Sequence, residues 1–171
     1  MTVPIAIVDY DPEWPRRYEA EAKRLRAKLG PVALRLEHVG STAVPGLRAK
    51  DIVDIQLSVA ALEPMQPYRA PLERLAYEYV VTEPEDHRFF RLERAGRRLF
   101  HLHVCQAEGE WERRHIVFRD HLRSHPEAAA AYERHKLELA PHFDIANDYA
   151  EAKDPFIRRL EREIGGSQMV E

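Results

Sequence analysis

Residues 32–59 read VALRLEHVGSTAVPGLRAKDIVDIQLSV, and the pattern of this stretch suggests how the rest of the chain is arranged. Hydrophobic side chains alternate with polar ones over residues 32–39 and again over residues 51–59, which is the period of a β-strand with one buried face. The segment between them, residues 40–47, is rich in turn-forming residues. We therefore predict two strands joined by a short connection. The polar face of the second strand carries Asp54, Gln56 and Ser58.

Hydrophobic spacing on either side of this stretch predicts the remaining elements. A period of three and four residues over 14–29 predicts a helix, with Asp11 as its candidate N-cap. The other expected elements are a helix over 64–76, strands over 77–82, 87–93 and 98–105, and helices over 111–123, 127–140 and 149–164. We expect Ala95-Gly96 to form a hairpin turn, Ser124 to cap the helix that follows it, and Gly165-Gly166 to end the last helix.

Together these elements predict an α+β fold of two layers, in which helices pack on a mixed sheet of four or five strands. The length of 171 residues suits one domain, and we expect a single domain over residues 1–171.

Composition excludes several classes of protein. The 44% hydrophobic content supports a core and makes intrinsic disorder unexpected, and the net charge of -3 argues against a globally basic nucleic-acid binder. The lone Cys105 excludes an intramolecular disulfide framework and a multi-cysteine zinc module. No run approaches the ~18 apolar residues of a membrane span, and the N-terminus has no secretory pattern. We expect a soluble cytoplasmic protein with no membrane or nucleic-acid partner, and the oligomeric state is left open.

The turn after the first strand has the composition of a phosphate site. Gly40 permits close approach of an anion to the backbone, and Ser41 and Thr42 add hydroxyl and amide donors. Asp54, on the following strand, is placed to hold a divalent cation against the phosphates. The alternative is that Gly40 and Gly46 only form turns and that Asp54 is a solvated strand residue.

A second pattern, His101-Leu102-His103, places two imidazoles on one face of a strand. With the Asp54 carboxylate they would make a set suited to Zn²⁺, Mn²⁺ or Fe²⁺ more than to Mg²⁺, and His38 is a possible fourth contributor. The alternative is that the histidines are hydrogen-bonding partners within a polar cleft. Cys105, on the same face, is expected to be a small buried residue rather than a reactive thiol.

Basic residues near these segments could bind phosphate or carboxylate. The candidates are Arg48, Lys50, Arg88, Arg91 and Lys153. Tyr149 lies one helical turn before Lys153, so the two side chains could be presented together. The alternative for that pair is a structural role, with Tyr149 packed and Lys153 paired to an acid. The helix over 127–138 is expected to present a solvated face. Trp111 and Phe118 are expected in the core or an interface rather than as base-stacking platforms.

Three segments resemble the GrpB family: EHVGSTAVPGLRAKDIVDIQ over 37–56, FHLHVC over 100–105 and YAEAKDPFI over 149–157. The resemblance extends over nearly the whole chain. That family is similar to a branch of the nucleotidyltransferase superfamily that includes polymerase β, and it also occurs as a domain appended to some dephospho-CoA kinases. The resemblance implies a nucleotidyltransferase-like two-layer fold with Gly40-Ser41 in the phosphate-binding position and Asp54 as the first metal-binding acid.

The sequence departs from the active superfamily pattern at Gln56, where active members carry a second carboxylate. A neutral amide does not supply the charge that a two-Mg²⁺ site requires, so ordinary two-metal nucleotidyl transfer is disfavoured. We expect a nucleotide or another phosphorylated small molecule to bind in a polar cleft with one divalent metal: Mg²⁺ or Mn²⁺, or Zn²⁺ if the histidines are ligands.

The sequence pattern and the family resemblance together predict the residues that bind the ligand and the metal. They are Gly40, Ser41, Thr42, Lys50, Asp54, Gln56, His101, His103, Tyr149 and Lys153. If the protein is a transferase, Asp54 and Lys50 are its candidate catalytic residues. Two alternatives stay open. One is a non-catalytic binding or accessory module that kept the fold. The other is a metal-dependent hydrolase-like site built from the histidines and the aspartate.

Overall fold

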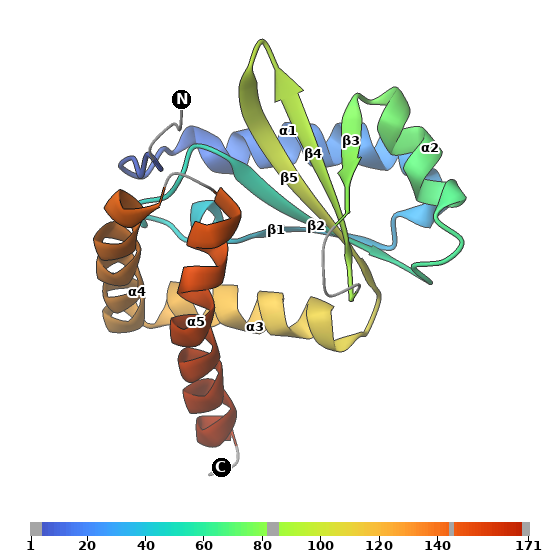
Figure 1. Cartoon of the computed structure of the whole chain (residues 1–171). Helices are drawn as coiled ribbons and strands as arrows, with labels where there is room; N and C mark the ends of the chain where they lie inside the picture. The colour runs from blue at the N-terminus through green and yellow to red at the C-terminus, as the bar shows by residue number, and fades with distance from the viewer. Residues whose placement is uncertain (1–4, 82–85, 144–145, 169–171) are drawn as a thin grey trace.

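The structure is a computed structural model that describes residues 5–81, 86–143 and 146–168 (Figure 1). The helices are α1 (Glu13–Leu29), α2 (Gln66–Arg74), α3 (Glu110–Ser124), α4 (Pro126–Leu139) and α5 (Ala146–Gln168). The strands are β1 (Arg35–Val39), β2 (Val53–Val59), β3 (Tyr77–Val80), β4 (Arg88–Arg94) and β5 (Arg97–Gln106). Short 3-10 turns occupy Gly30–Val32, Ser41–Ala43 and Ala140–His142.

The five strands form one mixed sheet in the order β1-β2-β5-β4-β3. Strands β2 and β5 are parallel, and the other neighbouring pairs are antiparallel. In the β2–β5 pairing, Asp54 lies opposite His101 and Gln56 lies opposite His103. The predicted α+β fold with a mixed sheet is confirmed. This register brings two polar segments that are distant in the sequence onto adjacent strands.

Helices cover both faces of the sheet, and the strand alternation decides which side chains meet which helices. Val53, Ile55, Leu57 and Val59 point to the face packed by α1 and α2, where they form the main core with Trp14, Leu25, Tyr68 and Leu72. The opposite face, which carries the polar side chains of β2, is approached by α3, α4 and α5 (Figure 1). The main hydrophobic core therefore lies on one side of the sheet and the polar residues on the other.

A second hydrophobic cluster joins the connection between β1 and β2 to the C-terminal helices. Val44 and Leu47 pack there with Leu122, Tyr132, Leu160 and Ile164. Because this connection carries the Gly40-Ser41 turn, the cluster places that turn against α4 and α5.

Several predicted boundaries are wrong. The first strand begins at Arg35 rather than at Val32, because residues 30–32 form a 3-10 turn with Pro31 near its start, and Leu34 is 49% exposed. The second strand begins at Val53, and the side chain of Asp51 instead binds Trp14 Nε1. Thr82, the last residue of the predicted strand over 77–82, lies outside the described residues.

The predicted helix ends are partly wrong as well. Asp11 does act as a cap, since its Oδ1 accepts a hydrogen bond of 2.9 Å from the Glu13 N–H. Ser124 does not cap α4, because its hydroxyl donates back to the carbonyls of Asp120 and His121 in α3. Helix α5 also continues through Gly165 and Gly166 instead of ending there.

Two predictions about single side chains are confirmed. Cys105 is fully buried, and its thiol lies 3.8 Å from the Ser58 hydroxyl. Burial raises the pKa of the Cys105 thiol to about 11, so the sulfur stays protonated at neutral pH. Phe118 packs against the second hydrophobic cluster.

Across the described ranges, we find no helix that is both long enough and apolar enough to span a membrane.

Candidate functional site

The centre of the candidate site is formed by Asp54 on β2 and by His101 and His103 on β5. His103 Nε2 donates a hydrogen bond of 3.3 Å to Asp54 Oδ1, and His101 Nδ1 lies 3.4 Å from the same oxygen. The three ligand atoms all lie within 4.8 Å of one another. The side chains are 28%, 14% and 21% exposed, in the order Asp54, His101 and His103. The cluster is therefore set into the surface but open on one side.

The two imidazoles control the charge of the carboxyl group. Burial alone would raise the pKa of Asp54, but the hydrogen bonds and charges of His101 and His103 outweigh this effect and hold that pKa well below its usual range. Burial also lowers the pKa of His101, although Asp54 acts in the opposite direction. An ionised carboxylate and a neutral imidazole are the protonation states that bind a metal ion.

Aromatic rings surround the two histidines and restrict their orientation. Phe89 on β4 lies 5.0 Å from His101 and 5.2 Å from His103, measured between ring centroids. Trp111 at the start of α3 stacks 5.4 Å from His103, and His87 lies 4.7 Å from Trp111. Trp111 thus belongs to the wall of the site rather than to the main core, and sequence reasoning missed this role.

The glycine turn lies beside the Asp54 carboxylate. Gly40 has a φ of +74° and leads directly into the 3-10 turn Ser41–Ala43. The Ser41 hydroxyl accepts a hydrogen bond of 3.0 Å from Lys136 Nζ. The structure therefore brings Gly40 and Ser41 to the candidate site, as expected from the sequence.

Thr42 and His38, in contrast, pair with each other away from the cluster. Thr42 is 1% exposed, and its hydroxyl is 2.9 Å from His38 Nε2. The His38 ring also stacks on Tyr18 of α1 at 4.9 Å, so it faces the side of the sheet that α1 covers, away from Asp54. The Thr42 side chain is thus not exposed to a ligand, and His38 is not a fourth member of the Asp54 cluster.

Gln56 is on the expected face but is fully buried. Helix α3 lies over this part of the sheet, where Arg119 binds Glu37 and Glu112 binds Ser58. Both amide atoms of Gln56 are buried, and neither has a hydrogen-bond partner among the described residues. Gln56 therefore contributes to the buried part of the site and not to an open floor.

Two lysines flank the ring of Tyr149, which lies on α5. Lys153 Nζ lies 4.6 Å and Lys50 Nζ lies 5.5 Å from the centroid of the Tyr149 ring. The Tyr149 side chain is buried, and its hydroxyl has no hydrogen-bond partner in the described part of the chain. These three predicted residues are therefore brought together.

A third lysine, Lys136 on α4, was missed by sequence reasoning. The helix over 127–138 was expected to be solvated, yet Lys136 is 2% exposed and donates to the Ser41 hydroxyl and to the Arg48 carbonyl. The signal that could have found it is a repeated spacing: Tyr132 precedes Lys136 by four residues, as Tyr149 precedes Lys153. Lys136 Nζ lies 5.0 Å from the Tyr132 ring centroid.

The three lysines influence one another electrostatically. Burial, followed by repulsion from Lys153, lowers the pKa of Lys136 to about 7 and that of Lys50 to about 8. Burial likewise lowers the pKa of Lys153, although the Asp54 carboxylate raises it. Among the described residues, none of the three forms an ion pair with a carboxylate. The arrangement would favour an anion placed between them.

The other basic candidates are engaged elsewhere. Arg91 binds Glu78 at 2.9 Å, Arg88 binds Glu63 at 3.0 Å, and Arg48 binds Asp9 at 2.8 Å. Their side chains serve ion pairs with neighbouring loops and strands.

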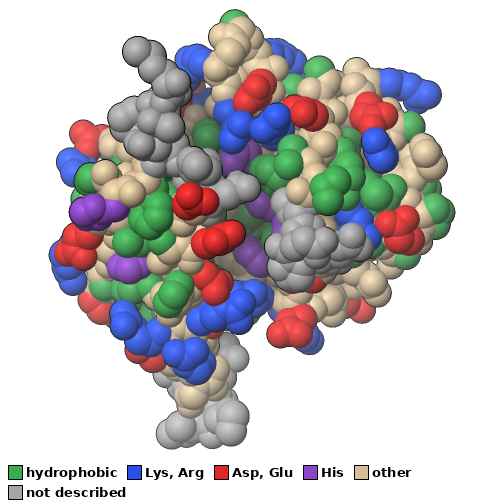
Figure 2. All heavy atoms as spheres, in the orientation of Figure 1, with side chains coloured by type: hydrophobic (Ala, Val, Ile, Leu, Met, Phe, Trp, Pro, Cys, Tyr) green, Lys and Arg blue, Asp and Glu red, His purple; other side chains and the backbone are tan. Residues whose placement is uncertain are grey.

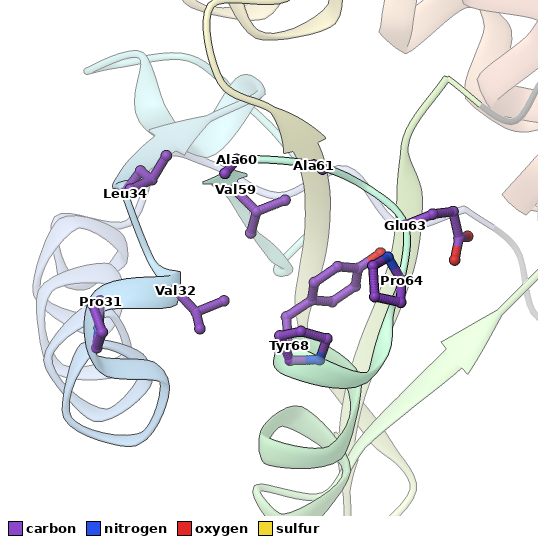
Figure 3. Close-up of a pocket in the computed structure, with 10 residues that line it drawn as sticks. Pro31, Val32, Leu34, Val59, Ala60, Ala61, Glu63, Pro64 and Tyr68 are labelled. Carbon is purple, nitrogen blue, oxygen red and sulfur yellow. The ribbon is translucent and has the colours of Figure 1, made fainter.

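The surface view is consistent with this geometry. Histidine side chains lie at the bottom of a hollow near the middle of one face, with Lys, Arg, Asp and Glu side chains around it (Figure 2). A separate cavity of about 230 Å³ lies beyond the far end of β2, where Val32, Val59, Pro64 and Tyr68 line it (Figure 3). That cavity is mainly apolar, and its one acid, Glu63, is bound to Arg88. Its lining does not suggest catalysis.

Comparison with known proteins finds a matching family and relatives of two kinds, UPF0157 proteins and dephospho-CoA kinases. The GrpB protein family matches residues 4–163. A UPF0157 protein of Halalkalibacterium halodurans is 38% identical over 159 residues, which cover 91% of this chain and 80% of that protein. A dephospho-CoA kinase of Mycolicibacterium paratuberculosis is 32% identical over 181 residues, which cover 91% of this chain but 44% of the kinase.

Solved structures identify the fold. The crystal structure of the conserved protein GrpB from Enterococcus faecalis matches with a TM-score of 0.83 and 32% identity, covering 96% of this chain and 99% of that one. The Cid1 poly(U) polymerase, in a crystal structure with MgGTP bound, matches with a TM-score of 0.53 and 15% identity, covering 77% of this chain and 42% of that one. The second likeness concerns the fold alone, which is nucleotidyltransferase-like. Because the GrpB match spans residues 4–163, which is nearly the whole chain, the chain belongs to the GrpB family.

Proposed function

We propose that this chain binds a nucleotide or another phosphorylated small molecule in the hollow beside Asp54. The observation that carries the proposal is the convergence of three lysines, of which Lys136 binds Ser41 of the glycine turn and Lys50 and Lys153 flank the ring of Tyr149. The chain has five lysines, and Lys50, Lys136 and Lys153 come from three separate segments to this one place.

The charge of these lysines supports an anionic ligand. Burial lowers the pKa of all three lysines, and repulsion from Lys153 lowers those of Lys50 and Lys136 further, so a negative charge between the ammonium groups would stabilise their charged forms. A polyphosphate would supply that charge, and Lys binds phosphate as a compact point charge. The backbone turn at Gly40-Ser41 would hold phosphate oxygens, and a divalent ion at Asp54 would neutralise the remaining charge.

The fold supports the same class of ligand by analogy. The Cid1 structure, which shares this nucleotidyltransferase-like fold, is described with MgGTP bound. Function does not follow from fold alone, so the weight of the proposal rests on the lysines and the turn.

Isothermal titration calorimetry with ATP and UTP, each with and without MnCl₂, tests this proposal. Lys136→Met and Lys153→Met should each weaken binding by about tenfold or more, since each removes a charge-assisted contact. Lys23→Met, at an exposed position of α1, is the matched control and should bind as the unmodified chain does. Absence of binding, or affinities that do not change in the two site variants, would overturn the proposal.

A second candidate function is a binding or accessory module without catalysis. Two observations favour it: Gln56 stands where a second carboxylate is required, and the related segment makes up less than half of the dephospho-CoA kinase from Mycolicibacterium paratuberculosis. Assays for pyrophosphate and orthophosphate release from bound ATP or UTP distinguish these functions. A transferase releases pyrophosphate as it passes the nucleotidyl group to an acceptor hydroxyl, a hydrolase transfers the terminal phosphoryl group to water and releases orthophosphate, and an accessory module binds the nucleotide and releases neither.

A further inference from the structure

We infer that Asp54, His101 and His103 form a single-ion site for a transition metal such as Zn²⁺, Mn²⁺ or Fe²⁺, in place of a two-magnesium centre. This inference deepens the proposed function, because the ion would lie between the protein and the phosphates of the bound ligand. It rests on the donor set, on the distances between the donor atoms, and on the way in which neighbouring residues hold them.

The donor set does not suit two magnesium ions. Mg²⁺ requires oxygen ligands in octahedral geometry, whereas two of the three donors here are imidazole nitrogens. The residue two positions after Asp54 is Gln56, which is neutral and fully buried. The nearest acids on this face are already engaged: Glu37 binds Arg119, and Glu112 binds Arg35. No second carboxylate in the described part of the chain therefore joins the Asp54 cluster.

The spacing of the donors suits one transition-metal ion. With metal–nitrogen and metal–oxygen bonds of about 2.0–2.2 Å, two ligand atoms of a tetrahedral site lie about 3.4 Å apart. The two nitrogen-to-oxygen separations here are 3.4 Å from His101 Nδ1 and 3.3 Å from His103 Nε2. An ion could replace the protons between these atoms with small side-chain movements. Two histidines and one carboxylate also leave further coordination positions open.

The surrounding residues hold the donors in place. Phe89 packs against both imidazole rings, and Trp111 stacks on that of His103. The Asp54 carboxylate lies directly under Gly40, which limits its movement. Because Asp54 is partly exposed, water or a phosphate oxygen could reach the open side of the cluster and complete the coordination.

Metal binding by the full chain, in the absence of any nucleotide, tests the inference. The protein is stripped with a chelator, desalted and titrated with Co²⁺, whose visible absorption reports nitrogen and oxygen ligands. Zn²⁺ and Mg²⁺ are then added in competition. We expect one Co²⁺ per chain, displaced by Zn²⁺ but not by Mg²⁺ at about a hundredfold excess.

Two site variants and one control variant test the ligands. Asp54→Asn and His103→Gln should each weaken Co²⁺ binding by about tenfold or more. The matched control is His121→Asn, because His121 and His125 stack at 4.0 Å at the end of α3 and are a plausible place for adventitious metal. That control should bind one Co²⁺ as the unmodified chain does. Circular dichroism of each variant verifies folding. Changes in the imidazole NMR signals of the unmodified chain on adding Zn²⁺ give a readout that needs no site variant, and two rings are expected to change.

The results that would overturn the inference are specific. They are no Co²⁺ binding, loss of binding in His121→Asn, unchanged binding in both Asp54→Asn and His103→Gln, or equal competition by Mg²⁺. Failure of the inference is separable from failure of the proposed function. Nucleotide binding that depends on Lys136 with no transition-metal binding would remove this inference alone, whereas stoichiometric Co²⁺ with no nucleotide binding would remove the proposed function alone.

Discussion

Gly40 and the Asp54 carboxylate approach each other so closely that no side chain fits between them. A Cβ atom on residue 40 would lie 2.7 Å from Asp54 Oδ2 and 3.1 Å from Asp54 Cγ. The backbone of Gly40 also has a φ of +74°, a conformation that other residues adopt at a cost. The turn and the carboxylate are therefore one structural unit. Glycine is required at position 40 because it allows the positive φ and because it leaves room for the Asp54 carboxylate.

Gly40→Ala should disturb the site more than an equivalent change elsewhere in the same loop. Gly46→Ala is the matched control, because Gly46 has a φ of +82° but open space around the position of its Cβ. Both variants should lose roughly 1–2 kcal/mol of unfolding free energy from backbone strain. Only Gly40→Ala should also weaken Co²⁺ binding, since the added methyl group must displace Asp54. Urea unfolding and Co²⁺ titration measure the two effects. Equal Co²⁺ affinity in both variants would contradict this account.

Lys136 should make stability rise with pH. Burial lowers its pKa in the folded protein to about 7, below the ordinary value of 10.5, so the unfolded chain binds more protons between these limits. The free energy of unfolding should therefore increase between pH 7 and pH 9, by about 2 kcal/mol from this group. Lys136→Met should lose that part of the increase. Urea unfolding of both proteins at the two pH values gives the difference. An identical pH dependence would show that Lys136 stays charged in the folded protein.

His38 should make the protein sensitive to acid. Burial lowers the pKa of His38 to about 4 from the ordinary value of 6.5. Its contribution to the free energy of unfolding is therefore complete above pH 6.5 and is lost as the pH falls toward 4. Between pH 7 and pH 4.5 the loss of unfolding free energy from this group should be about 2 kcal/mol. His38→Gln should reduce the acid sensitivity, and His142→Gln, at an exposed position, should not. Urea unfolding at both pH values measures this. A loss that is the same in all three proteins would refute the assignment.

Glu112 should anchor α3 to the edge of the sheet. Its carboxylate accepts hydrogen bonds of 2.7 Å and 2.8 Å from Arg35 and one from the buried hydroxyl of Ser58. Glu112→Ala leaves that hydroxyl without this partner and should cost about 2–3 kcal/mol of unfolding free energy. The control is Glu93→Ala, which breaks an exposed pair with Arg98 and should cost less than about 1 kcal/mol. Equal losses in urea unfolding would show that the network is not anchoring α3.

The elements of the fold were largely predictable because their patterns are local. The alternation over 51–59 and 98–105 identified β2 and β5, and it also identified which of their side chains share a face. The errors occurred at ends, as at Ser124 and Gly165, where a cap or a stop depends on how neighbouring helices pack.

The candidate site was predictable only in part. Asp54, His101 and His103 could be proposed together because polar residues on a half-buried sheet gather on one face. Lys136 was missed, because its helix is rich in alanine and the helical pattern does not indicate which face is covered; only the spacing from Tyr132 pointed to it. The burial of Thr42 and Gln56 also depends on elements distant in the sequence: Thr42 pairs with His38, and α3 lies over Gln56.

By itself, the sequence determined which residues form strands, which of their side chains point the same way, and that a glycine turn precedes Asp54. These properties depend on backbone period and local conformation, which a short segment specifies. Only the tertiary structure decided that β5 pairs with β2, so that the two histidines lie beside Asp54. It also decided that α4 brings Lys136 to the turn and that α5 places Tyr149 beside Lys50. Those contacts join residues far apart along the chain, and their free energy comes from burial between surfaces that exist only once the chain has folded.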